Sequence, residues 1–122
     1  MTSAYGKGSK GKATRLHSLV VRSRGSCERC GSGNGLQCAH IISRRYSATR
    51  TDEVNAWCLC AGCHMRLTQH PYEHMEFVAQ TIGMDRFDVL RAKAEAGVKT
   101  NDAFWQGEVE RLTGLLQTIG DV

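Results

Sequence analysis

Four cysteines stand in two closely spaced pairs. Cys27 and Cys30 are separated by two residues, and Cys60 and Cys63 repeat this spacing. Each pair can present two thiolates from one tight turn, and two pairs supply the four ligands of a tetrahedral zinc ion. The spacing therefore predicts a structural zinc site. The weaker alternative is that some of these residues are buried thiols without a metal.

Cys38 and Cys58 have no partner at this spacing, and each lies in an apolar run. We expect them to be small core residues, because a free cysteine packs like a small apolar side chain. Cys58 lies two residues before Cys60, so competition for the metal is the alternative.

A histidine, an asparagine and a second histidine accompany the pairs: His40, Asn55 and His64. A neutral imidazole can accept a proton or bind a metal near neutral pH, and a side-chain amide can orient a neighbouring group. Each residue alone has an ordinary explanation, as a buried histidine or a turn asparagine. Their combination with the cysteine pairs favours a reactive or metal-binding centre.

These residues must be positioned by a short run of elements. Leu36 to Ile42 is apolar and follows the turn-rich GSGNG, so it predicts a strand. Residues 43–53 are polar and basic and predict a loop. Asn55 to Leu59 predicts a second strand, and Gly62 to about Gln69 has a composition typical of a helix.

The chain before the first cysteine pair divides into two parts. Residues 1–12 are rich in Gly, Ser and Lys and are expected to form a flexible basic tail, because they contain too little apolar surface to fold. From Ala13 to about Arg24, apolar residues recur at helical spacing and predict a short amphipathic helix, with a strand as the alternative. His17 lies outside the cysteine motif and is expected at the surface.

Three helices are predicted in the last part of the chain. Pro71 is placed to open the first, which ends near Gly83. Its expected core face consists of Tyr72, Met75, Ala79 and Ile82. Asp85 is expected to cap the second helix, which ends at Gly97, and Asn101 to cap the third. The third helix is expected to face the core, or alternatively a partner, through Trp105, Val109, Leu112, Leu116 and Ile119.

Charge is divided unevenly along the chain. Residues 1–66 carry eleven Lys and Arg against three acidic residues, whereas the remainder carries five against nine. A basic half that also contains the cysteine pairs favours a polyanionic partner, most simply nucleic acid, over a surface that is basic only for solubility. The sequence has no apolar run that could span a membrane and no apolar core of a secretory signal, so we expect a cytoplasmic protein without a membrane partner.

Four features of this sequence together resemble the HNH endonuclease family, in its small phage-type form. They are the two cysteine pairs, the sequence A-H-I-I around His40, Asn55 at the start of the second strand, and C-x-x-C-H ending at His64. The resemblance covers Ser26 to about His70. It implies an α+β fold in which a small ββα-metal core is clamped by a four-cysteine zinc site.

The same resemblance implies a domain organisation. The ββα-metal core would span about residues 26–70, with an N-terminal helix before it and a helical C-terminal part, 71–122, after it. Residues 13–122 would then form a single HNH nuclease domain, a size that suits one modest core.

Matched positions take on the family's roles. The resemblance implies that His40 is the general base that activates water, that Asn55 orients this base, and that His64 binds a catalytic divalent metal ion at the scissile phosphate. Mg²⁺ is the expected ion, although imidazole also admits Mn²⁺, Ni²⁺ or Zn²⁺.

Two positions depart from the family's pattern. Ala39 stands where many relatives carry an Asp or His ligand, and Thr68 where some carry a second helical histidine. Water and substrate phosphate would then complete the coordination. His70 is the candidate extra metal ligand, with a surface residue before Pro71 as the alternative.

Four arginines are expected to bind DNA phosphates: Arg44, Arg45 and Arg50 in the loop and Arg66 on the helix. A guanidinium matches phosphate oxygens and positions a protein on DNA without reading its sequence. A solvated basic loop is the alternative.

The resulting hypothesis is a metal-dependent HNH endonuclease that nicks or cuts DNA in the cytoplasm of a bacterium or phage-infected host cell, with structural Zn²⁺ and catalytic Mg²⁺. The first alternative is a zinc-supported DNA-binding or assembly module without nuclease activity. The second is a zinc protein whose C-terminal helices bind another copy of the chain, or a phage or host protein.

Overall fold

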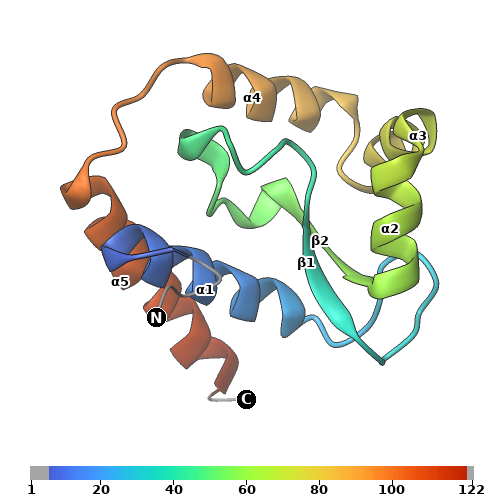
Figure 1. Ribbon diagram of the computed structural model, residues 1–122, viewed down its shortest axis with the longest axis horizontal. Helices are drawn as coiled ribbons and strands as arrows, with labels where there is room; N and C mark the ends of the chain where they lie inside the picture. Colours follow the sequence, from blue (N-terminus) through green and yellow to red (C-terminus); the bar gives the residue numbers. More distant parts are fainter. Residues whose placement is uncertain (1–5, 121–122) are drawn as a thin grey trace.

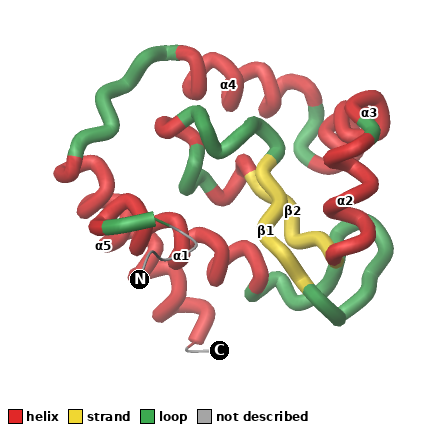
Figure 2. The backbone as a smooth tube through the Cα atoms, viewed as in Figure 1, coloured by secondary structure: helices red, strands yellow, loops and turns green. Residues whose placement is uncertain are grey.

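The computed structural model describes residues 6–120, which form five α-helices and one two-stranded antiparallel sheet (Figures 1 and 2). The expected α+β class is confirmed. In chain order the elements are α1 (Gly8–Arg22), β1 (Leu36–His40), the 3-10 turns η1 (Ser47–Thr49) and η2 (Glu53–Asn55), β2 (Ala56–Cys60), α2 (Ala61–Gln69), α3 (Pro71–Thr81), α4 (Met84–Glu95) and α5 (Asp102–Gly120).

The two strands form a hairpin whose faces carry different side chains. In the antiparallel register Leu36 is opposite Cys60 and His40 is opposite Ala56. Because side chains alternate along a strand, Gln37 and Ala39 face α2, whereas Cys38 and His40 face α1. The hairpin is therefore covered on one side by α2 and α3 and on the other by α1 (Figure 1).

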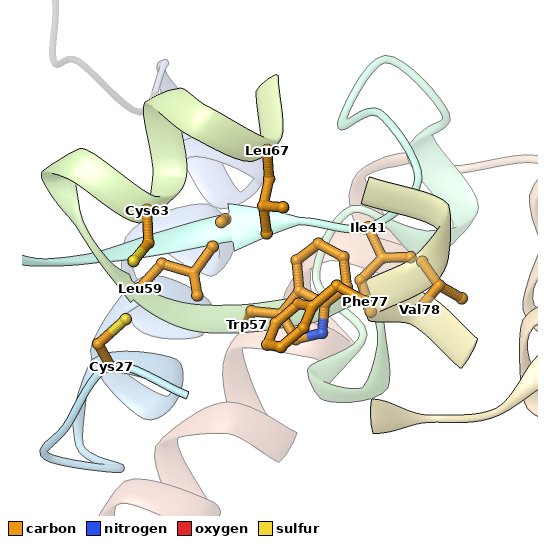
Figure 3. Packing of buried hydrophobic residues seen from close by; sticks show 9 residues of the cluster. Cys27, Ile41, Trp57, Leu59, Cys63, Leu67, Phe77 and Val78 are labelled. Atoms are coloured by element: carbon orange, nitrogen blue, oxygen red, sulfur yellow. The ribbon is translucent and has the colours of Figure 1, made fainter. Parts of the chain in front are cut away.

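The first hydrophobic cluster lies between the hairpin and helices α2 and α3. Trp57 on β2 is only 1% exposed, and its indole Nε1–H donates to Thr81 Oγ1 of α3 at 2.9 Å. Figure 3 shows Cys27 and Cys63 at one end of this cluster and Phe77 and Val78 at the other. Apolar packing thus holds α2 and α3 against the strand that carries Cys60.

The second cluster joins the two ends of the chain. Helices α1 and α5 lie side by side (Figure 1), and their buried contact residues are Ala13, Leu16, Val20, Trp105 and Leu112. The expected core face of the last helix is confirmed at Trp105 and Leu112, while Ile119 is 41% exposed.

Helix α1 begins five residues earlier than predicted, so residues 8–12 are helical rather than a tail. Gly11 is buried, and a Cβ atom at this position would overlap the backbone carbonyl of Gly6. Close packing therefore requires glycine here, although glycine lowers helix propensity. The first five residues of the expected tail lie outside the described residues.

Two predictions about α3 and α4 are wrong. The buried residues of α3 are Phe77 and Val78, whereas Tyr72, assigned to the core, is 87% exposed. Helix α4 is preceded by Gly83 at φ 82°, and Asp85 lies within its first turn instead of capping it. By contrast, Asn101 caps α5 as predicted: its Oδ1 accepts the N–H of Phe104 at 3.0 Å.

Within residues 6–120, no helix combines the length and the apolar character needed to cross a membrane.

Candidate metal centre and cavity

The structure brings the two cysteine pairs together at one point. Cys27 and Cys30 follow the end of α1, Cys60 ends β2 and Cys63 lies in the first turn of α2, and the four sulfur atoms all lie within 4.8 Å of one another. Cys30 Sγ and Cys60 Sγ are 3.6 Å apart. Tetrahedral zinc with Zn–S bonds of about 2.3 Å separates its sulfurs by about 3.8 Å. The cluster can therefore hold a metal such as zinc, as predicted.

The surroundings of this cluster favour a thiolate at Cys27, whereas burial and the three neighbouring cysteines raise the pKa of Cys63 to about 12. Arg29 Nη1 donates to Cys63 Sγ at 3.4 Å, and the backbone N–H of Cys30 donates to Cys27 Sγ at 3.4 Å. Burial opposes ionisation of Cys27, but backbone N–H groups at Cys60, Cys30 and Arg29 outweigh it and lower the pKa of Cys27 to about 6. A thiolate is the form that binds a metal ion.

Cys58 does not join the four sulfurs, so the alternative that it competes for this metal is not supported. It is fully buried, and its backbone exchanges hydrogen bonds with Glu28: Glu28 N–H donates to Cys58 O at 2.8 Å, and Cys58 N–H donates to Glu28 Oε2 at 2.5 Å. These bonds fasten the first cysteine turn to β2.

His40, the last residue of β1, is oriented by the loop that follows it. Its Nε2–H donates to the backbone carbonyl of Arg50 at 2.8 Å, which leaves the lone pair of a neutral ring on Nδ1. Burial is the main cause that lowers the pKa of His40 to about 4, helped by the nearby His17. The free imidazole is thus neutral at physiological pH.

Asn55 is fully buried and ties the loop to the hairpin. Its Oδ1 accepts the N–H of Ile42 at 2.7 Å, and its Nδ2 donates to the carbonyls of Ile42 and Thr49, each at 3.0 Å. Thr49 directly precedes Arg50, whose carbonyl holds His40. The hydrogen bonds expected from this amide across the loop are therefore present.

His64 on α2 is half-buried, and its Nδ1–H donates to Gln37 Oε1 of β1 at 2.7 Å, which leaves Nε2 with the lone pair. Residues of β1, α2 and α3 line a cavity of about 380 Å³, and His40, His64 and His74 are among them. The two groups of three or more potential ligands found among the described residues do not include His64.

His74 belongs to none of the sequence motifs, yet it lies at this cavity. Its Nε2–H donates to the carbonyl of Ile41 at 3.0 Å, and its ring packs edge-on against Trp57 with centroids 5.0 Å apart. The adjoining Phe77 and Val78 mark the buried face of α3, but the sequence periodicity pointed to a different face.

The remaining candidate ligand, His70, lies at the junction of α2 and α3 and is not among the residues that line the cavity. Its Nδ1–H donates to the carbonyl of Arg66 at 2.8 Å, and Nδ1 lies 3.8 Å from Glu73 Oε2. These contacts account for its position without a metal.

The four arginines predicted to bind phosphates differ in whether their side chains already have hydrogen-bond or ion-pair partners. Arg66 forms a two-pronged ion pair with Glu73, with N–O distances of 2.6 and 2.9 Å, and Arg50 Nε donates to Thr14 Oγ1 at 3.0 Å. Arg44 and Arg45 are exposed in the loop after β1. Arg44 and Arg45 are thus best placed to meet an anion.

His17 is fully buried, so the prediction of a surface position is wrong. Its Nε2–H donates to the carbonyl of Asp52 at 3.0 Å, and its Nδ1 lies 3.7 Å from Cys38 Sγ. One ligand atom from each of His17, Cys38 and His40 lies within 4.8 Å of the other two. Burial lowers the pKa of His17 and raises that of Cys38 to about 12.

In comparisons with known proteins, no family model, no curated protein and no solved structure matches this chain. Its function must therefore be inferred from its own residues.

Proposed function

We propose that the chain is a metal-dependent HNH endonuclease that hydrolyses DNA phosphodiester bonds, with residues 26–70 as its ββα-metal core. The observation that carries this proposal is the state of His40: a neutral, oriented imidazole with its lone pair on Nδ1, in a residue that lines the same cavity as His64. Hydrolysis of a phosphodiester needs a base for the attacking water and positive charge for the developing anion.

His40 supplies the base. Its Nδ1 lone pair accepts the proton of a water molecule that attacks the phosphorus atom. A pKa of about 4 makes the free imidazole a weak base. An anionic phosphate bound beside the ring favours the protonated form, and so raises this pKa towards the working pH when substrate arrives.

His64 supplies a ligand for the catalytic metal. With Nδ1 bound to Gln37, Nε2 is the atom available for Mg²⁺ or Mn²⁺. Ala39 and Thr68 add no ligand, so water and phosphate oxygens complete the coordination. An ion held in this way stabilises charge on the scissile phosphate and the leaving oxygen.

Asn55 is a positioning residue for this chemistry. Its bond to the Thr49 carbonyl fixes the peptide next to Arg50, and the Arg50 carbonyl in turn fixes the ring of His40. Arg44 and Arg45 hold the DNA backbone, and zinc at the four cysteines supports the fold.

The proposal is tested by incubating supercoiled plasmid with the zinc-loaded chain and Mg²⁺ or Mn²⁺. Nicked or linear DNA is expected from the wild type and none from His40→Ala. His70→Ala is the matched control, because it removes a half-buried histidine outside the cavity, and it should cleave normally. Full activity in His40→Ala, or no cleavage by the wild type with either ion, would overturn the proposal.

A zinc-supported DNA-binding or assembly module is the second candidate. It is favoured by the sparse ligand set at His64, which has Ala39 opposite it on β1 and Thr68 one turn further along α2. Mn²⁺ broadens nearby NMR signals, so a titration observed at the His64 ring separates the two. No broadening with or without DNA, combined with retained DNA binding, would favour the module.

A further inference from the structure

A second group of potential metal ligands, separate from the four-cysteine cluster, lies on the face of the hairpin that α1 covers. It joins His17 from the middle of α1 to Cys38 and His40, which are two residues apart on β1 and so point to the same side. The three ligand atoms lie within 4.8 Å of one another, and His17 Nδ1 is 3.7 Å from Cys38 Sγ. That separation is close to the spacing of two ligands on one transition-metal ion, about 3.5 Å.

Both imidazole rings are held as metal-binding histidines commonly are. His17 Nε2–H donates to the Asp52 carbonyl and His40 Nε2–H to the Arg50 carbonyl, at 3.0 and 2.8 Å. A ring held in this way carries its proton on Nε2 and presents a lone pair on Nδ1. The rings therefore do not need to change tautomer to bind an ion through Nδ1.

We propose that His17, Cys38 and His40 form a second metal site, which binds a soft divalent transition-metal ion such as Zn²⁺ and is distinct from the four-cysteine site. One thiolate and two imidazoles form a ligand set that favours Zn²⁺ over Mg²⁺, because Mg²⁺ prefers oxygen ligands. Three protein ligands leave the fourth position of a tetrahedral ion open.

Charged groups of both signs lie around this site, and the thiol supplies a negative charge of its own. On binding, the Cys38 thiol loses its proton to solvent, so that a thiolate offsets one of the two charges of the metal. Asp52 and Glu53 lie near His17, while Arg22 and Arg24 lie near Cys38 and Arg44 and Arg50 lie near His40. Cys38 and His40 are only partly buried, so an ion can enter from their side although His17 is fully enclosed.

Occupation of this site has a consequence for the proposed nuclease, and this consequence alone rests on the proposed function. The lone pair of His40 cannot bind Zn²⁺ and accept a proton from water at the same time. Excess Zn²⁺ should therefore inhibit cleavage supported by Mg²⁺, while the zinc at the four cysteines stays in place.

Zinc stoichiometry tests the site without any reference to catalysis. The full-length chain is equilibrated with excess Zn²⁺, passed through a desalting column and assayed for bound metal. We expect two ions per chain in the wild type and one in Cys38→Ala. Cys58→Ala is the matched control: Cys58 is paired directly with Cys38 across the hairpin but lies outside the ligand group, so this variant should keep two ions.

Cobalt identifies the ligands. After one equivalent of Zn²⁺ has filled the four-cysteine site, added Co²⁺ should give a sulfur-to-cobalt absorption band in the wild type and in Cys58→Ala. The band should be absent in Cys38→Ala and lost or shifted in His17→Gln, which keeps a donor for the Asp52 carbonyl. A wild type that stops at one ion, or a Cys38→Ala variant that still binds two, would overturn the second site whether or not the chain cleaves DNA.

Discussion

The imidazole rings of His17 on α1 and His40 on β1 lie with their centroids 5.3 Å apart, inclined by 32°. Burial lowers the pKa of both residues, and a proton on one ring would further disfavour a proton on the other. Helix α1 therefore does more than cover the hairpin. It also supplies His17, which adds to the effect of burial in keeping His40 neutral.

The pH dependence of cleavage should reflect this pairing. An enzyme whose histidine base has the ordinary pKa of 6.5 would lose activity tenfold per pH unit below that pKa. His40 stays unprotonated down to about pH 4, because its pKa is lowered to about 4. Because kcat/KM reports the free enzyme, we expect it to show no acid limb between pH 8 and about 5.5. The profile is measured at saturating metal, and kcat, which reports the DNA complex, should fall at a higher pH than kcat/KM. An acid limb of kcat/KM centred at 6.5 or above would contradict the prediction.

The environment of His17 shows why the sequence could not predict this pair. A single helical stripe was visible in the residues that follow Ala13, but α1 buries two faces, one against α5 and one against the hairpin. A polar residue on the second face looks like a surface residue until the hairpin is folded onto it. The same limit applies to α3, where the exposed Tyr72 matched helical spacing as well as the buried Phe77 did.

Elsewhere, patterns between neighbouring residues in the sequence were sufficient to predict the structure. The spacing of the cysteine pairs predicted the four-sulfur cluster because ligands of one ion must lie at the ends of short turns. Asn101 as the cap of α5 and Pro71 as the first residue of α3 follow from hydrogen bonding and φ at one position, with no need for distant contacts. Features that depend on residues far apart in the sequence, including the position of His74 at the cavity, could be found only from the structure.

Replacing Asn55 with Ala should be costly. The change removes one acceptor and two donor bonds in a fully buried position and takes these partners from the N–H and the carbonyl of Ile42, while the Thr49 carbonyl still accepts the N–H of Asp52 at 3.2 Å. We expect a loss of about 3 kcal/mol in the free energy of unfolding, measured by urea denaturation. Asn101→Ala, at the exposed cap of α5, is the comparison and should cost about 1 kcal/mol. Equal effects of the two substitutions would argue against a special role for the buried amide.

The arginines should contribute unequally to DNA binding. Arg44 and Arg45 are exposed, and neither has an acidic partner among the ion pairs of the described residues, whereas Arg66 is already paired with Glu73. Arg44→Ala and Arg45→Ala should each weaken binding and reduce the slope of log K against log salt by about 1. Fluorescence anisotropy over a range of NaCl concentrations measures both quantities. Arg66→Ala should change the slope less, and Arg86→Ala, at an exposed position on α4, should leave it unchanged. A larger effect from Arg66 than from Arg44 would move the proposed DNA path towards α3.

Loss of the metal from the four cysteines should unfold the domain. A two-stranded hairpin is marginal by itself, and the segment between α1 and β1 is rich in Gly and Ser, with Cys27 as its buried apolar residue. Zinc binding at such sites contributes about 10 kcal/mol or more, which is comparable with the whole stability of a small domain. A strong chelator should therefore abolish the cooperative thermal transition seen by circular dichroism, and added Zn²⁺ should restore it.

Cys30→Ser separates the contribution of the metal to stability from the contribution of apolar packing. Because Cys30 is exposed, this substitution removes one ligand and almost no buried apolar surface, so any large destabilisation must come from the metal site. We expect the variant to behave like the chelated wild type. Cys58→Ser changes a fully buried thiol outside the four-sulfur cluster, and it should keep a zinc-dependent transition at a lower temperature. A Cys30→Ser variant that unfolds at the wild-type temperature would show that the fold does not depend on this ion, and would leave the hairpin to be held by the Trp57 cluster alone.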